Sequence, residues 1–291
     1  MSPAEFNQKI TEIREDRVRG ASELARGCLA VLAQAARELP AESVAEWQKR
    51  LLQLSADLAE TRPSMTPVGN LLRRWNEGLA VDARSNLPVA RRSAAGRAEG
   101  LIERSRRAVA DCAAHAARLL GSGRPIMTHS FSSTVLETCR LLKDRELRMV
   151  VTESRPLEEG RRLAEQLSAW RVPTVYVTDA QMGLFVAEAA AVLVGADSVL
   201  ADGAVLNKAG TYLLALAARE RGVPFYVCCE SFKRRAASDP PWVLEEMAAT
   251  ELGVPLWPEV TVRNVYFEVT PARLVSAWID ETGVRQSREN Q

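Results

Sequence analysis

The sequence predicts an α/β protein in which a helical N-terminal domain precedes a doubly wound domain built on a parallel sheet. Two observations support this prediction. Apolar residues recur at three- and four-residue spacing through residues 1–120, as in amphipathic helices. From Arg124 onward, short runs rich in β-branched residues alternate with helical stretches, which is typical of βαβ units. We therefore expect two domains, residues 1–120 and residues 121–291.

Four stretches of the N-terminal half have helical periodicity. The first covers residues 21–40, where Pro40 closes the helix. Residues 41–60 repeat the spacing, and residues 61–79 open with Thr and Pro before another helical run. Residues 88–120 are rich in alanine and arginine and predict one long helix.

Five apolar runs in the second half are predicted strands: residues 124–130, 147–154, 172–179, 190–202 and 223–231. Predicted helices at residues 133–144 and 157–170 lie among the first four strands, and another at residues 210–222 precedes the fifth. This alternation predicts a Rossmann-like sheet with helices on both faces.

Each predicted strand ends in polar residues. These ends are Thr128-His129-Ser130, Glu153-Ser154-Arg155, Thr178-Asp179, Asp202-Gly203 and Glu230-Ser231. Ligands of doubly wound sheets bind outside the carboxyl ends of the strands. We therefore expect the five ends to line one crevice.

Composition excludes several classes of protein. The net charge of +1 argues against a general nucleic-acid surface. No run of eighteen apolar residues predicts a membrane span, and the polar N-terminal segment has no apolar signal core. The five scattered cysteines and two histidines predict neither disulfides nor a metal site, so we expect a cytoplasmic protein.

Nucleotide-cofactor motifs are missing where such a fold would carry them. The segment after the first predicted strand, THSFSST, is not G-x-G-x-x-G, and no G-x-x-x-x-G-K-[ST] occurs. The sequence therefore predicts no cofactor.

A long motif runs through residues 195–234. It contains Gly195-Ala196-Asp197, Asp202-Gly203, Asn207-Lys208, Gly210-Thr211 and Pro224-Phe225-Tyr226-Val227. This segment resembles the family that joins the alpha, beta and delta regulatory subunits of eukaryotic translation initiation factor 2B to two sugar-phosphate isomerases. Those isomerases act on methylthioribose-1-phosphate and ribose-1,5-bisphosphate.

Shorter matches extend the resemblance over most of the chain. Residues 126–130, 151–167 and 264–283 match in the second half. Residues 17–22 and 61–72 resemble the two arginine loops of the family, and Glu230-Ser231-Phe232-Lys233 is most similar to the alpha subunit.

The resemblance implies two proton-transfer residues that this sequence lacks. Ser130 stands where the isomerases have a cysteine, and Ala204 stands where they have an aspartate. A serine hydroxyl needs a separate base, and an alanine transfers no proton. Loss of one such group typically costs about 10²–10⁴-fold in rate. Isomerase activity is therefore not the expected function.

Asp202 leaves an alternative open. It lies two residues before Ala204, and residues two apart on a strand share a face. If the backbone is extended there, the Asp202 carboxylate partly substitutes for the missing aspartate, with Ser130 as its partner. Asp-Gly is also a common turn pair, which predicts a purely structural Asp202.

The anion-binding residues implied by the family are mostly present. They are Arg19, Gly20, Ala21, Arg62, Ser130, Arg155, Asp202, Asn207 and Lys208. Arginine forks, lysine charges and helix N-termini all favour phosphate. The alternative is that the arginines are solvated or paired with Glu15, Glu60 or Glu153.

Other polar residues have two interpretations each. His129 is a base for Ser130 or a buried structural residue, and Cys228 and Cys229 pack in the core. Asp179 either binds a sugar hydroxyl or caps a helix. Asp197 orders its loop through buried hydrogen bonds, and Glu230 either reaches the ligand or caps a turn.

We therefore expect a binding and regulatory protein, similar to the alpha subunit, that binds a phosphorylated sugar or nucleoside monophosphate between its domains. The alternative is an aldose-phosphate isomerase with altered acid and base residues. The resemblance also implies a homodimer with residues 223–234 and 264–271 in its interface, and leaves a higher oligomer open.

Overall fold

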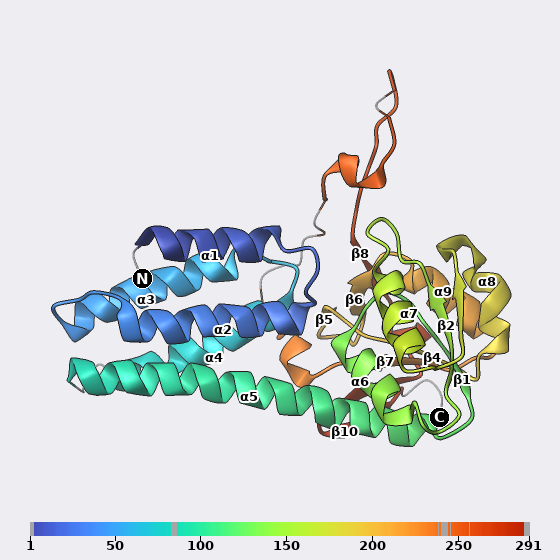
Figure 1. Cartoon of the computed structure of the whole chain (residues 1–291), viewed down its shortest axis with the longest axis horizontal. Coiled ribbons are helices and arrows are strands. Elements are labelled where there is room, and N and C mark those ends of the chain that lie inside the picture. The colour runs from blue at the N-terminus through green and yellow to red at the C-terminus, as the bar shows by residue number, and fades with distance from the viewer. Residues whose placement is uncertain are drawn as a thin grey trace. The chain divides into compact units, whose positions relative to one another are not determined.

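The computed structural model describes residues 3–82, 86–237, 239, 244, 246–255 and 257–287. The chain divides into two compact units, Met1–Arg107 and Ala108–Gln291. The division falls inside helix α5, Leu87–Leu120, so one long helix contributes residues to both units (Figure 1).

The first unit is helical, as predicted. Its described elements are α1 Pro3–Glu15, α2 Ala21–Glu38, α3 Val44–Ala59, α4 Thr66–Asp82 and the first part of α5. Helix α2 ends just before Pro40. Helix α3 begins after Ser43, whose side chain accepts a hydrogen bond from the backbone N–H of Glu46 at 3.2 Å.

Two tryptophans anchor the core of the helical unit. Trp47 and Trp75 are fully buried among the leucines of α2, α3 and α4. The indole N–H of Trp47 donates to the Ala36 carbonyl at 3.1 Å, and that of Trp75 donates to the Ala94 carbonyl at 2.9 Å. Each indole therefore fills the core and also ties its own helix to a neighbouring one.

The second unit contains the predicted doubly wound sheet. Its strands, in spatial order, are β10 Gly283–Gln286, β9 Ala277–Asp280, β7 Phe225–Cys228, β4 Ala191–Val194, β1 Pro125–Thr128, β2 Arg148–Thr152 and β3 Thr174–Val177. All neighbours are parallel except β10, which pairs with β9 in the antiparallel sense. The chain order reverses between β1 and β4, which is the switch point of a doubly wound fold.

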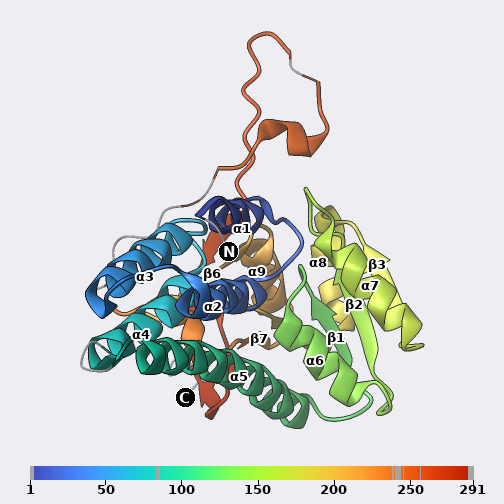
Figure 2. The same ribbon diagram turned by 60° about the vertical axis from the view of Figure 1, so that its left-hand side comes forward.

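Alternate side chains of the strands build two cores, one on each face of the sheet. Met127, Val192 and Val194 pack with α8 Met182–Phe185 and α9 Thr211–Glu220. Ile126, Met149 and Leu193 are among the strand residues that pack with α6 Ser133–Leu142, α7 Glu159–Ala169 and the end of α5 on the other face (Figures 1 and 2). This alternation explains why the strands are near-continuous apolar runs.

Residues 190–202, predicted as one strand, form two strands in different sheets. The first part is β4 of the main sheet, and Ser198–Val199 is β5 of a small antiparallel sheet with β6 Val205–Lys208 and β8 Phe267–Thr270. The chain leaves the main sheet at Gly195-Ala196-Asp197, where a polar residue and a glycine interrupt the apolar run. The small sheet was not predicted.

Short 3₁₀ segments complete the described secondary structure: Asp179–Gln181, Val186–Glu188, Ser231–Lys233, Ala249–Leu252 and Ala272–Leu274. All five cysteines are free and buried. No helix among the described residues is long and apolar enough to span a membrane.

Candidate functional site

The switch point brings two strand ends and one helix start together. Strand β1 ends at Thr128 and β4 ends just before Gly195. A methyl group at Gly195 would lie 2.5 Å from the hydroxyl of Ser132, the residue that caps α6. The N-terminus of α6 therefore lies directly beside the end of β4, where its free N–H groups favour an anion.

A buried hydrogen-bond chain underlies this edge of the sheet. The backbone N–H of Ser130 donates to the Ser154 hydroxyl at 2.7 Å, and that hydroxyl lies 3.2 Å from the hydroxyl of Thr152. Thr152 Oγ1 lies 2.6 Å from Nδ1 of His129, and Nε2 of His129 lies 2.8 Å from the carbonyl oxygen of Ala209. One chain of contacts thus joins the ends of β1, β2 and β6.

These partners define the state of His129. A carbonyl oxygen only accepts, so Nε2 carries the hydrogen and Nδ1 accepts from Thr152. Burial lowers the pKa of His129, and nearby Lys208 lowers it further, against the opposing charge of Asp179. The ring is therefore neutral and both of its nitrogens are engaged. His129 is a buried structural residue and has no free nitrogen to act as a base for Ser130.

The lowered pKa of His129 predicts a pH dependence of stability. Below about pH 6.5 the unfolded chain protonates this histidine while the folded chain does not, so stability is lost as the pH falls from there toward the folded pKa. We expect the free energy of unfolding to drop by on the order of 1 kcal/mol between pH 7.5 and 5.5. Urea titrations should show this slope disappearing in His129→Gln and persisting in His115→Gln, a half-exposed control. An unchanged slope in His129→Gln would contradict the assignment.

Asp179 is not the predicted helix cap, and its carboxylate bonds the backbone after β2. Thr178 caps the 3₁₀ turn, and the Asp179 carboxylate accepts the backbone N–H groups of Ser154 at 2.9 Å and Arg155 at 2.8 Å.

Ser130 and Ser154 both have left-handed backbone, with φ of 67° and 63°. Such conformations in non-glycine residues cost energy and cluster at functional loops.

The predicted cations Arg155 and Lys208 both pair with acidic residues of the chain. Arg155 lies 3.2 Å from Glu158, not from the Glu153 considered in the sequence. The buried Lys208 ammonium lies 2.5 Å from Glu159 and 4.2 Å from the ring centre of Tyr266. Lys208 therefore links β6 to α7 in this structure, and a ligand would have to compete with Glu159.

The N-terminus of α9 differs from the prediction, because an internal carboxylate satisfies its N–H groups. Glu268 Oε1 accepts from the backbone N–H groups of Gly210 at 2.6 Å and Tyr212 at 2.9 Å. Asn207 donates to the Thr211 hydroxyl at 3.0 Å. This helix start already holds an anion that belongs to the chain itself.

Asp202 lies in a turn outside the main sheet. Its Oδ1 accepts the backbone N–H of Ala204 at 2.9 Å, and its side chain is exposed. The backbone is not extended at Asp202, so the condition under which it would replace the missing aspartate is not met. The prediction that Asp202-Gly203 ends a strand of the crevice is wrong, because β5 and β6 belong to the second sheet.

Lys233 lies at this edge of the main sheet and was not among the predicted ligand residues. It is 5% exposed, and its ammonium lies 3.8 Å from Glu230, which also accepts from the Thr134 hydroxyl at 3.4 Å. Burial alone would lower the pKa of Lys233, but the charges of Glu230 and Asp197 outweigh burial and raise it. Lys233 is thus a buried, charged ammonium at the end of β7. The signal in the sequence that could have identified Lys233 is its position just after the predicted strand end Glu230-Ser231.

The thiols do not replace the missing cysteine. Burial raises the pKa of Cys28 and Cys139 to about 12. The pKa values of Cys112 and Cys229 are also raised, the first by its contact with Cys228 and by burial, the second by burial. A thiol that stays protonated near neutrality is a poor proton acceptor.

The four predicted ligand residues of the helical unit have partners inside that unit. Arg19 pairs with Asp16 at 2.7 Å, and Gly20 caps α2, which begins at Ala21. Arg62 is buried, and its Nε donates to the Ile13 carbonyl at 3.4 Å. Their ligand role stays a prediction from the resemblance.

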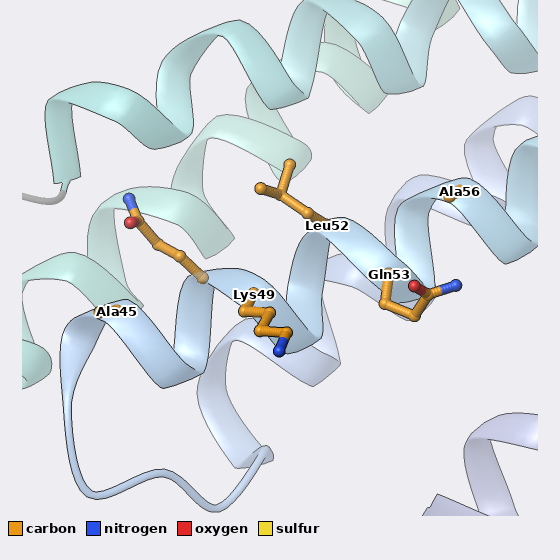
Figure 3. Close-up of a pocket in the computed structure, with 6 residues that line it drawn as sticks. Ala45, Lys49, Leu52, Gln53 and Ala56 are labelled. Carbon is orange, nitrogen blue, oxygen red and sulfur yellow. The ribbon is translucent and has the colours of Figure 1, made fainter.

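A groove of about 480 Å³ lies on the helical unit but contains none of the predicted ligand residues. It is lined by Ala45, Gln48, Lys49, Leu52, Gln53 and Ala56. Figure 3 shows that the labelled residues all project from α3, so the groove is a surface feature of one helix. Among the described residues, no cluster of three or more metal-binding side chains occurs.

The strand order and its switch point define a doubly wound α/β protein with a helical N-terminal unit. Residues 17–287 match the Initiation factor 2 subunit family, and the chain belongs to that family. The family relationship inferred from residues 195–234 is thereby confirmed.

Known relatives include both kinds of protein expected from the motifs. The chain is 37% identical over 288 residues to a Pyrococcus horikoshii protein named translation initiation factor eIF-2B subunit 2-like, covering 98% of this chain and 97% of the relative. It is 29% identical over 288 residues to the ribose 1,5-bisphosphate isomerase of Pyrococcus furiosus, covering 94% and 88%. The crystal structure of Pyrococcus horikoshii translation initiation factor eIF-2B matches with a TM-score of 0.85 at 35% identity, covering 99% of both chains.

Proposed function

We propose that the chain is a cytoplasmic, initiation factor 2B subunit-like protein that binds a phosphorylated sugar or nucleoside monophosphate and does not isomerise it. The observation that carries this proposal is the pairing of a phosphate-compatible edge with missing acid–base groups. The edge has the buried Lys233 and the start of α6, while Ser130 and Ala204 occupy the positions of proton transfer.

Lys233 is the favoured phosphate contact because, among the described residues, no carboxylate lies within hydrogen-bond distance of its ammonium. Within the described residues it makes one ion pair, at 3.8 Å, which is longer than a hydrogen bond. Lys208, by contrast, already has a carboxylate at 2.5 Å. A phosphate that accepts from Lys233 and from the first N–H groups of α6 would displace no internal hydrogen bond of that ammonium.

The binding test compares two lysine variants. We expect Lys233→Met to weaken binding of ribose 5-phosphate or adenosine monophosphate by at least about tenfold in calorimetric titrations, because one charge-assisted contact is lost. Lys49→Met, on the exposed face of α3, should bind as the wild type does. Lys233→Arg keeps the positive charge, so it should bind more tightly than Lys233→Met if the charge is what the phosphate needs. Unchanged affinity in a folded Lys233→Met protein would exclude Lys233 from the site.

Isomerase activity is the second candidate, favoured by the relationship to ribose 1,5-bisphosphate isomerase. It would need Asp202 and Ser130 as the proton-transfer residues. The assay is ketose formation from ribose-1,5-bisphosphate and methylthioribose-1-phosphate. Turnover by the wild type that Asp202→Ala abolishes would overturn the binding-only proposal.

We also propose a homodimer that uses α8 and α9. Leu184 on α8 is 70% exposed, and Leu213 and Leu216 on α9 are 63% and 38% exposed. The predicted interface segment 223–234 is a poor candidate, because Phe225, Val227 and Cys228 of β7 are buried inside this chain. A patch of exposed leucines on adjacent helices is typical of a protein interface.

The dimer prediction is tested by mass. Light scattering should give twice 32.0 kDa for the wild type and 32.0 kDa for Leu213→Asp, because a carboxylate in an apolar interface opposes association. Leu52→Asp, at a leucine of α3 that is 45% exposed, is the control and should leave the mass unchanged. A dimeric Leu213→Asp protein would place the interface elsewhere.

A further inference from the structure

A polar cavity lies at the amino-terminal edge of the main sheet. Its volume is about 460 Å³, within the range of small-molecule sites. Val223 and Pro224 precede β7, and Val275 and Ser276 precede β9. Because these strands are parallel, the cavity lies at the edge opposite to their carboxyl ends. It is therefore separate from the edge that carries Lys233.

Two arginines from different elements give this cavity its charge. Arg219 comes from the last turn of α9, and Arg273 comes from the 3₁₀ turn before β9. Both are exposed. Within the described part of the chain, neither guanidinium has a hydrogen bond or ion pair to another residue.

The cavity also lacks acidic residues. None of its ten lining residues is Asp or Glu. At the carboxyl edge, in contrast, Arg155, Lys208 and Lys233 each have a glutamate partner. The end of α9 contributes only about half a negative charge, and its carbonyls accept the N–H groups of Gly222 and Val223. Two full positive charges therefore dominate the cavity.

The remaining lining residues suit the organic part of a ligand. Pro224, Tyr226 and Leu274 supply apolar surface. Ser276 accepts from the backbone N–H of Phe225 at 3.0 Å, which leaves its own hydroxyl hydrogen available to donate. Guanidinium groups bind phosphate oxygens in pairs, whereas the apolar wall favours a ring.

We propose that this cavity is a second anion site, which binds a phosphomonoester of nucleoside-monophosphate size through Arg219 and Arg273. The phosphate contacts both guanidiniums, and the ring lies against Pro224, Tyr226 and Leu274. The site is independent of the proposed function and of the carboxyl edge.

Protection of arginines from phenylglyoxal tests the proposal. The probe is adenosine monophosphate, and the protein is the full chain carrying Lys233→Met, so that the carboxyl-edge site does not contribute. Mass spectrometry of the modified protein should show that the probe protects Arg219 and Arg273 several-fold. Arg221, an exposed neighbour at the end of α9 that does not line the cavity, should react equally with and without the probe. Adenosine without phosphate should protect none of the three.

Variants localise the effect. In the same Lys233→Met chain, Arg273→Gln should weaken adenosine monophosphate binding at least tenfold in calorimetry and remove the protection of Arg219, whereas Arg221→Gln should change neither. Equal modification of Arg219 and Arg273 with and without the probe would overturn the proposal. Equal protection of Arg221 would also overturn it, because it would indicate general shielding of the surface.

Discussion

Replacing Gly160 with alanine is expected to destabilise the α/β unit by more than about 4 kcal/mol, the range of exceptional single substitutions. A Cβ atom at this position would lie 1.7 Å from the backbone oxygen of Thr152 and 3.2 Å from the carbonyl carbon of Glu153. Both obstacles are main-chain atoms, so no side-chain rotation relieves the clash. The methyl group must instead push α7 away from the end of β2.

That displacement would reach the buried network of the site. Thr152 pairs with Val177 in the sheet, and its hydroxyl donates to His129. Gly160 also donates its own N–H to the carbonyl of Glu153 at 3.2 Å. The close approach of α7 thus fixes the end of β2. Ser154 follows this strand end, and its hydroxyl accepts the backbone N–H of Ser130.

Urea unfolding followed by circular dichroism measures the effect. Gly183→Ala on α8 is the matched control, since a Cβ there meets no atom within 4 Å. We expect that control to be neutral or stabilising by up to about 1 kcal/mol, because alanine has the higher helix propensity. A Gly160→Ala protein as stable as the control would show that α7 can shift at little cost.

Truncating Trp75 to alanine is expected to destabilise the helical unit by about 3–5 kcal/mol. The indole is fully buried on α4, and its N–H donates to the Ala94 carbonyl of α5 at 2.9 Å. Alanine leaves a cavity in the core and removes the hydrogen bond between the two helices. Trp75→Phe should lower the stability less, because the phenyl ring keeps most of the buried volume and only the indole hydrogen bond is lost.

Calorimetric unfolding checks this prediction and offers an internal comparison. Trp257 is 49% exposed, so Trp257→Ala should change the midpoint little. A similar midpoint for Trp75→Ala and Trp257→Ala would contradict the burial of Trp75. The chain divides into two units, which can unfold in separate calorimetric transitions. A transition whose midpoint shifts only in Trp75→Ala would be the unfolding of the helical unit.

Local patterns were sufficient for most elements of the fold. Helical spacing predicted α2 and α5 within a few residues, and the β-branched runs predicted β1, β2 and β7. These signals are local because one apolar face must be buried whatever the partner is. The small sheet escaped prediction because its strands pair residues far apart in the chain, such as Leu206 with Val269. Nothing in either segment specifies that pairing.

For the site residues, too, the sequence predicted positions along the chain but not the partners that folding brings to them. The sequence placed His129, Ser130 and Ser154 at strand ends, and the structure joins them in one network. It did not show which carboxylate meets which cation. Lys208 pairs with Glu159, and the start of α9 binds Glu268, residues 49 and 57 positions away from Lys208 and Thr211 along the chain.

By itself, the sequence determined the family and the order of most helices and strands, and it predicted that Ser130 and Ala204 replace the two proton-transfer residues of the isomerases. These properties depend on residue identity and on short-range spacing. The tertiary structure alone decided that Asp202 is a turn residue, that His129 is neutral with both nitrogens engaged, and that Lys233 is a buried cation 3.8 Å from Glu230. Hydrogen bonding, ion pairing and burial depend on groups that folding brings together from distant parts of the chain.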